Sequence, residues 1–428
     1  MSHQPAIDTD DIRIDTTPLD NFDHIVSAEM PWHCIEKIKD RLSEGNAEQT
    51  DEQLASLLAQ ICMDESIARS ERDPVWGPQL KAGVKPALPA ENEPFKLTFA
   101  LDIEPLFEWP DFATFEIIRP ARVITDELVA QELHQQQIEA GSSEPTETPA
   151  TTDDLVTLDV SLHRIDSDEL ILSWTDVPCR LHAPGTPIIL NGLVFTGAES
   201  LLRGARAGEE KSTTTQPPAA LSKDILDSEV KIKVKIKTVE RPTPAPIQDV
   251  LDQYGTPNED ILLMQIRTSL ESRFSIEQRI YMIRQFFEKL VNAIEYTPPK
   301  RIINKHLNEE SNQISAKILE EGGTREDVTS HLEKNAKESR QRVTGRLKHS
   351  MLSSMLQKNQ EITMHEGDLQ AEIGRLAALT GQRPEELRKK LIDSNQIKSV
   401  SAQVIDGKIF DKIMPQMVLK DVDADSLM

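Results

Sequence analysis

The chain changes from strand periodicity to helix periodicity at one proline-rich junction, and this junction constrains the fold most. Residues 241–246 read Arg-Pro-Thr-Pro-Ala-Pro, and closely spaced prolines favour a stiff, extended connector. Before it, residues 230–237 alternate between apolar residues and lysine, as a strand with one buried face does. After it, apolar residues recur at helical spacing from Glu259 to about Glu295, enough for a rod of roughly 55 Å. The sequence therefore predicts a small β domain followed by an all-α domain.

Four more helices are expected after this rod, and the breaks between them are short. Short breaks between long helices favour antiparallel hairpins, so we expect helical arms. The expected helices lie at about residues 300–321, 325–360, 366–380 and 384–393.

The N-terminal part has a different pattern. Helical spacing occurs at about residues 31–42 and 51–68, and residues 95–103 alternate without a fault between apolar and polar side chains. We expect a small α+β unit here. A short strand at 114–118 and a helix at 125–140 follow, and then a polar segment, residues 141–152, predicts a flexible linker. The predicted domains are 1–118, 119–152, 153–243 and 244–428.

Charge excludes several classes of partner. The chain of 428 residues carries 72 acidic and 48 basic side chains and a formal charge of -24, so it lacks the positive field that collects DNA or anionic lipid. The lysines of residues 230–237 are interpreted as a solvated strand face rather than an RNA contact. The acidic N-terminus lacks an apolar signal region and no run of 18 apolar residues occurs, so we expect a cytoplasmic protein without a membrane partner.

Motifs for conventional catalysis are missing from the sequence. It contains no P-loop, no dinucleotide-binding glycine pattern, no GxSxG and no HExxH, and its 10 histidines lack metal-ligand spacing. Cys34, Cys62 and Cys179 form no CxxC pair and are expected to be reduced thiols. We therefore expect no catalytic residue, no cofactor and no metal site.

Several local motifs carry a resemblance to a known family. The order of the strand at 95–103, an Ile-Thr-Asp-Glu-Leu helix start from Ile124, a small β domain and a helical C-terminal half resembles bacterial trigger factor. Within the β domain, the run Val-Phe-Thr-Gly-Ala-Glu from Val194 resembles the signature of FKBP-type prolyl isomerases. Tyr296-Thr-Pro-Pro-Lys and Gly381-Gln-Arg-Pro-Glu-Glu-Leu resemble helix breaks in the family's C-terminal half. The resemblance implies a multidomain α+β protein with a small α+β N-terminal unit, an FKBP-like β-sheet domain with one short helix, and a long all-α domain with arms.

The departures from the family concern the isomerase pocket and the ribosome. The platform aromatic is replaced by Ala198, the preceding proline by Thr196 and an aromatic of the first strand by Val160. Val194 and Phe195 remain as pocket lining, so we expect weak or no isomerase activity, with an active isomerase as the alternative. No segment of residues 1–90 fits the family's Gly-Phe-Arg-x-Gly-x-x-Pro docking loop. We therefore do not expect ribosome docking by that loop, while another route through the N-terminal unit stays open.

The resemblance implies an ATP-independent chaperone that binds unfolded or nascent polypeptides through scattered apolar patches. A scaffold for one dedicated protein partner is the other alternative. The sequence names neither the clients nor the oligomeric state. The candidate client-binding residues are Phe274, Phe286, Phe287, Ile302, Ile303, Met351, Leu352, Met355 and Leu356.

Overall fold

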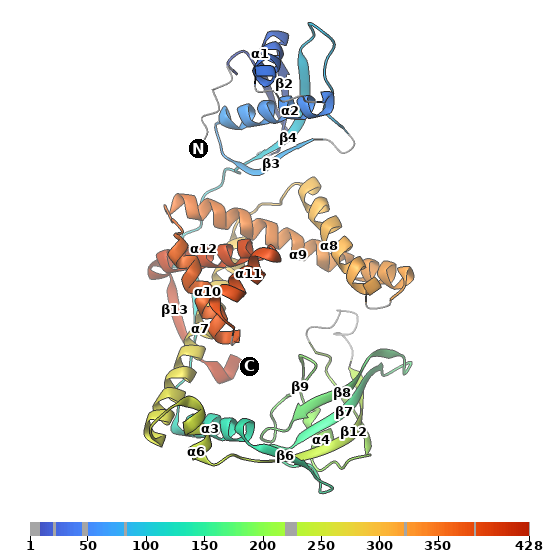
Figure 1. Cartoon of the computed structure of the whole chain (residues 1–428), viewed down its shortest axis with the longest axis vertical. Coiled ribbons are helices and arrows are strands. Elements are labelled where there is room, and N and C mark those ends of the chain that lie inside the picture. The colour runs from blue at the N-terminus through green and yellow to red at the C-terminus, as the bar shows by residue number, and fades with distance from the viewer. Residues whose placement is uncertain are drawn as a thin grey trace. The chain divides into compact units, whose positions relative to one another are not determined.

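The computed structural model describes residues 9–19, 23–44, 50–80, 84–218, 229–320, 323–380 and 382–427. The chain forms two compact units, each built from segments distant in sequence (Figure 1). Unit 1 comprises Met1–Ile118 and Met282–Lys420, and unit 2 comprises Arg119–Tyr281 and Asp421–Met428. The N-terminal residues and most of the helical half thus belong to one unit, and the β domain belongs to the other.

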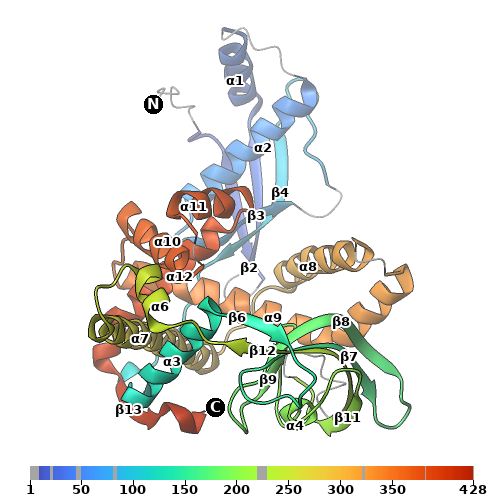
Figure 2. The same cartoon turned by 60° about the horizontal axis from the view of Figure 1, so that its bottom comes forward.

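The N-terminal part of unit 1 is a four-stranded antiparallel sheet covered by two helices. Its strand order is β1-β2-β4-β3, and α2 lies along the sheet (Figure 2). Apolar side chains of β2, β4, α1 and α2 share one core. The elements are β1 (Arg13–Pro18), β2 (Asp23–Met30), α1 (Trp32–Glu44), α2 (Asp51–Ala68), β3 (Pro74–Leu80) and β4 (Phe95–Ile103).

Residue alternation and helix caps explain why the sequence predicted some of these strands and helices and not others. The alternation in β4 puts Phe95, Leu97 and Phe99 into the core. A capping box between Thr50 and Gln53 begins α2. The strand at 95–103 and both helices are confirmed, the helices to within two residues. Strand β3 was missed because its two prolines obscure the alternation, and its register with β4 is irregular around Trp76.

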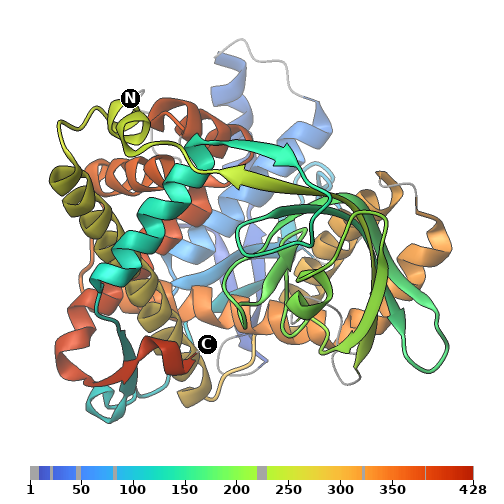
Figure 3. The same ribbon diagram turned by 90° about the horizontal axis from the view of Figure 1, so that it is seen from below.

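The β domain of unit 2 is a twisted antiparallel sheet of order β11-β12-β7-β8, with a short β9–β10 hairpin. Figure 3 shows its strands curled around the short helix α4. Apolar residues of β7, β12 and α4 form one closed core. The elements are β7 (Leu155–Arg164), β8 (Leu170–Arg180), β9 (Ile188–Leu190), β10 (Leu193–Phe195), α4 (Glu199–Leu202), β11 (Glu210–Thr215) and β12 (Val230–Thr243). Among the residues that the structure describes, the predicted β domain with a short helix is confirmed.

The lysines of β12 face outward and pair with acidic neighbours. Lys233 lies 2.9 Å from Asp168, Lys235 lies 3.1 Å from Glu210, and Lys237 lies 2.9 Å from Asp159. Exposed pairs of this kind contribute little to stability, but they neutralise the lysine row. This arrangement fits a solvated strand face.

The segment predicted as a flexible linker is ordered, which corrects the sequence analysis. Strand β6 (Ser142–Pro145) pairs with the end of β12, and Ala150 is 1% exposed in the β-domain core. Farther along, the buried Asp154 carboxylate accepts hydrogen bonds from Arg241 and from the Thr151 backbone, both at 2.8 Å. The polar composition suggested a linker, but strand pairing to β12 is a long-range contact that composition does not report.

The rest of unit 2 is helical. Helices α3 (Asp126–Ala140), α6 (Ile247–Tyr254) and the first part of α7 (Glu259–Ala293) share a small apolar core. Helix α3 begins at the Thr125 cap as the sequence predicted. Helix α6 was not predicted because only two turns separate the proline connector from Gly255, whose φ of 63° ends the helix.

The helical part of unit 1 surrounds an aromatic core. It contains the end of α7 and the helices α8 (Lys300–Glu320), α9 (Arg325–Asn359), α10 (Glu366–Thr380), α11 (Pro384–Asp393) and α12 (Ile397–Ile413). All four helices expected after α7 are confirmed, while α12 was missed. The strand expected at 114–118 begins two residues later as β5 (Glu116–Ala121), which pairs with β13 (Val418–Asp423). The helix-break glycine Gly381 lies outside the described residues.

Candidate functional site

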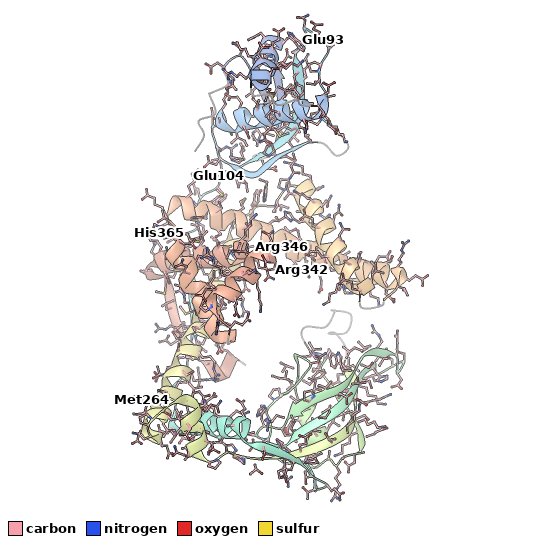
Figure 4. The ribbon with its side chains drawn as sticks, viewed as in Figure 1. Glu93, Glu104, Met264, Arg342, Arg346 and His365 are labelled. Carbon is pink, nitrogen blue, oxygen red and sulfur yellow. The ribbon has the colours of Figure 1, made fainter. Side chains whose placement is uncertain are left out.

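Helices α8 and α9 form an antiparallel hairpin, the arm that short helix breaks predicted. Its apolar seam joins Ile302 and Ile303 of α8 to Val343 and Leu347 of α9. Polar contacts continue along the hairpin, where Arg342, labelled on α9 in Figure 4, pairs with Glu310. The hairpin is therefore held by an apolar seam and by polar contacts between its two helices.

An open groove lies in unit 1 between the end of α7, the middle of α9 and the segment that follows β4. We call it the α7–α9 groove, and its volume is about 850 Å³. Its lining combines apolar side chains, neutral hydrogen-bonding groups and three charged side chains, those of Glu295, Arg340 and Lys348. The lining residues are Pro105, Leu106, Phe107, Val291, Asn292, Ile294, Glu295, Tyr296, Thr297, Arg340, Gln341, Thr344, Gly345 and Lys348.

The apolar part of this groove includes an exposed leucine. Leu106 is 76% exposed, and Phe107 beside it meets Trp109 edge to face with ring centroids 4.9 Å apart. Single exposed leucines are common on protein surfaces, but at the rim of a groove beside two aromatic rings this one adds apolar area that a bound chain can cover. Gly345 keeps the α9 wall open, because a Cβ added there would meet no atom within 4 Å.

The polar part of the groove contains a lysine, Lys348, whose pKa is shifted. The Lys348 ammonium donates a hydrogen bond to the Ile294 carbonyl. Burial lowers the pKa of Lys348, and the nearby Glu295 carboxylate opposes this shift. Asn292, Gln341 and Thr344 offer amide and hydroxyl groups that can donate or accept. This lining can bind the backbone of an extended polypeptide with little regard to its sequence.

Seven of the nine client-binding candidates lie in cores. Phe286 and Leu352 are fully buried, and none of the seven is more than 2% exposed. A side chain without accessible surface cannot touch a client in this conformation, so the pattern identified helix packing at these positions and not an exposed patch. The seven residues are Phe286, Phe287, Ile302, Ile303, Met351, Leu352 and Leu356.

The other two candidates, Phe274 and Met355, are half-buried. Phe274 lines a smaller groove of about 300 Å³ in unit 2, between α3 and α7. The guanidinium of Arg122 lies 5.9 Å from its ring centroid, a cation–π distance. Phe274 is therefore accessible enough to contact a client. Leu106 of the α7–α9 groove was not among the candidates, because it lies outside any helix and helical periodicity could not identify it.

The residues predicted to line an isomerase pocket do not form one. Phe195 and Ala198 are fully buried and Val160 is 2% exposed, all three within the β-domain core. Val194 is 51% exposed and Thr196 is also on the surface. These five residues were predicted to share one pocket because the matching positions of FKBP-type prolyl isomerases do. Here they divide between a closed core and open solvent.

None of the described helices is long and apolar enough to cross a bilayer. A family model described as "Bacterial trigger factor protein (TF) C-terminus" matches residues 260–415, which include the whole arm and the helices after it. The helical half is therefore similar in sequence to the C-terminal part of bacterial trigger factors.

Similar proteins extend the match beyond this half. The trigger factor of Rhizobium etli is 24% identical over 333 residues, covering 77% of this chain and 66% of the relative. That of Opitutus terrae is 24% identical over 351 residues, covering 79% of this chain and 78% of the relative. A solved structure described as "Promiscuous Substrate Recognition in Folding and Assembly Activities of the Trigger Factor Chaperone" aligns over 94% of this chain and 99% of its own, with a TM-score of 0.42 and 14% identity.

Residues 260–415 therefore match the C-terminal domain of bacterial trigger factors, within a multidomain α+β chain. These similarities support membership of the trigger factor family.

Proposed function

We propose that this protein is a cytoplasmic, ATP-independent chaperone that binds unfolded or nascent polypeptides and assists their folding. The α7–α9 groove carries the proposal, since it combines an exposed leucine with neutral groups that can pair with any backbone. The relatives named trigger factor support the same proposal.

The groove suits weak and reversible capture. Burying one leucine-sized client side chain against Leu106 and Phe107 contributes about 1.5–3 kcal/mol, and ordering the client segment offsets part of this gain. Several such sites acting together hold an unfolded chain, while each releases its segment easily. We infer that the smaller groove at Phe274 is a second site of this kind.

A glycine substitution tests the groove without disturbing the core. Gly345→Leu fills the open wall of α9, and Gly374→Leu on α10 is the matched control because a Cβ added at either glycine meets no atom within 4 Å. Both changes raise helix propensity. We expect Gly345→Leu to weaken binding of several fluorescent unfolded clients roughly tenfold, which corresponds to about 1.4 kcal/mol, and Gly374→Leu to leave it unchanged.

Equal affinities for wild type and Gly345→Leu would remove the groove from the proposal. Tight binding of one folded protein, with no affinity for unfolded clients, would favour the dedicated scaffold instead.

We further propose that the β domain has little or no prolyl isomerase activity. FKBP-type catalysis holds a proline ring against apolar and aromatic side chains while the peptide bond, whose barrier is about 18–20 kcal/mol, rotates. The full burial of Phe195 and Ala198 supports the proposal, because neither can touch such a ring.

We also infer that ribosome docking does not use the family's usual loop.

A further inference from the structure

Three different ligating atoms converge at the start of α1. The Nε2 atom of His33 lies 2.8 Å from Oδ2 of Asp11 and 3.4 Å from Sγ of Cys34. All three atoms lie within 4.8 Å of one another, and they form the one such group of His, Cys, Asp or Glu atoms found in the part of the chain that the structure describes.

Hydrogen bonding alone does not explain why all three atoms lie so close together. The Asp11 oxygen and the Cys34 sulfur both approach the same nitrogen, and Nε2 carries either one N–H or one lone pair, so it can make a full hydrogen bond to only one of them. The arrangement also differs from a nucleophilic triad, in which the carboxylate and the thiol contact opposite nitrogens of the imidazole. A cation bound among the three atoms would contact all of them at once.

The cluster is held in place by its surroundings. Cys34 is 3% exposed in the N-terminal core, and its backbone N–H donates to the Pro31 carbonyl at 3.1 Å. On the other side, Arg69 of α2 donates to the carbonyls of Thr9 and Ile12, both at 2.8 Å. These two bonds flank Asp11, so the backbone on both sides of the cluster is anchored before any ion binds. Preorganised ligands of this kind favour specific metal binding.

The donor set selects the class of ion. Thiolate, imidazole and carboxylate together suit Zn²⁺, whereas Mg²⁺ and Ca²⁺ prefer oxygen alone. Two anionic ligands would balance the two charges of the ion. The Asp11 and His33 side chains are 57% and 50% exposed, so water can reach a fourth position. The sequence offered no metal-ligand spacing because Asp11 lies 22 residues before His33.

We propose that Asp11, His33 and Cys34 form a Zn²⁺ site that fastens the segment before β1 to the first turn of α1. The bound ion is expected to stabilise the N-terminal sheet and helices, because a ligand that binds only the folded state raises the free energy of unfolding. The proposal does not depend on the chaperone function.

The test uses the full-length protein, freed of metal by a chelator and titrated with Co²⁺ as a spectroscopic substitute for zinc. We expect one equivalent to produce a thiolate-to-cobalt charge-transfer band in the near ultraviolet, and zinc to displace it. We expect Cys34→Ser to abolish the band, and His33→Gln and Asp11→Asn each to weaken Zn²⁺ binding at least tenfold. Added Zn²⁺ is expected to raise the melting temperature of the wild type and not of these variants.

The matched control is His134→Gln. His134 lies 3.0 Å from Asp153 and is half-exposed, but no third ligating atom joins that pair among the described residues. We expect this variant to bind like the wild type. Because His33 and Asp11 are largely solvent-exposed, their variants remain informative if Cys34→Ser folds poorly. A missing charge-transfer band in the wild type, or an equal loss of Zn²⁺ affinity in His33→Gln and His134→Gln, would overturn the proposal.

Discussion

Replacing Phe286 by alanine tests whether the apolar residues of the helical half are core or client surface. Phe286 is fully buried, and its ring centroid lies 5.0 Å from that of Phe287, 6.0 Å from that of Phe410 and 6.1 Å from that of Phe112. Removing it leaves a cavity between three helices and the segment that precedes β5. A buried Phe→Ala change costs about 3–5 kcal/mol.

The upper end of this range is expected at Phe286. Each aromatic contact contributes about 0.5–1.5 kcal/mol beyond burial, and these contributions overlap with the cavity cost rather than adding to it. Phe274→Ala is the matched comparison, since that ring is half-buried, and we expect it to cost on the order of 1 kcal/mol.

Urea unfolding monitored by tryptophan fluorescence provides the assay, because Trp76 and Trp109 pack against this core. The chain has more than one unit, so only the transition that these tryptophans report is compared between variants. We expect Phe286→Ala to shift its midpoint to lower urea, and client binding to remain intact at temperatures where the variant is folded. An unchanged midpoint together with lost client binding would show that Phe286 is a client contact and that the assignment to the core is wrong.

Two further predictions concern the β domain. The full-length protein should not accelerate cis-to-trans conversion of an Xaa-Pro peptide, and Ala198→Trp should destabilise the domain by at least about 1–3 kcal/mol through overpacking rather than create activity. Burial opposes ionisation of Asp154, but hydrogen bonds from Arg241 and Thr151 hold its pKa below the ordinary value, so the stability it contributes at neutral pH should be lost as pH falls below about 3.9. Asp154→Asn should be less stable at pH 7 and show a weaker acid dependence in thermal melts.

Local pattern predicted most helices and the strands with one buried face. The alternation of β4 and β12 and the caps at Thr50 and Thr125 are encoded within a few residues. Strand β6 was missed because its stability comes from pairing with β12, about a hundred residues away. Such pairing depends on a partner strand that is distant in sequence, and a polar segment of four residues has no hydrophobic periodicity that would predict a strand.

The candidate site was harder to predict than the fold. Helical periodicity identifies the apolar face of a helix but does not show whether another helix covers that face. The buried Phe286 and Leu352 were therefore predicted as client contacts on the same grounds as the half-buried Phe274. The groove depends on Leu106, which lies between two strands, and on Gly345, whose missing side chain leaves space. In the β domain, the signature around Ala198 predicted the turn and the short helix, while the burial of Phe195 followed from packing that the motif does not contain.

We propose chaperone activity without nucleotide for this protein, and light scattering of refolding clients measures that activity. Several unrelated denatured proteins are diluted into buffer with and without an excess of the full-length protein, in the absence of ATP. We expect scattering to fall for each client as more protein is added, because the proposed groove offers apolar area and neutral groups that suit a polypeptide of any sequence. Undiminished aggregation of several different clients at excess protein would contradict it.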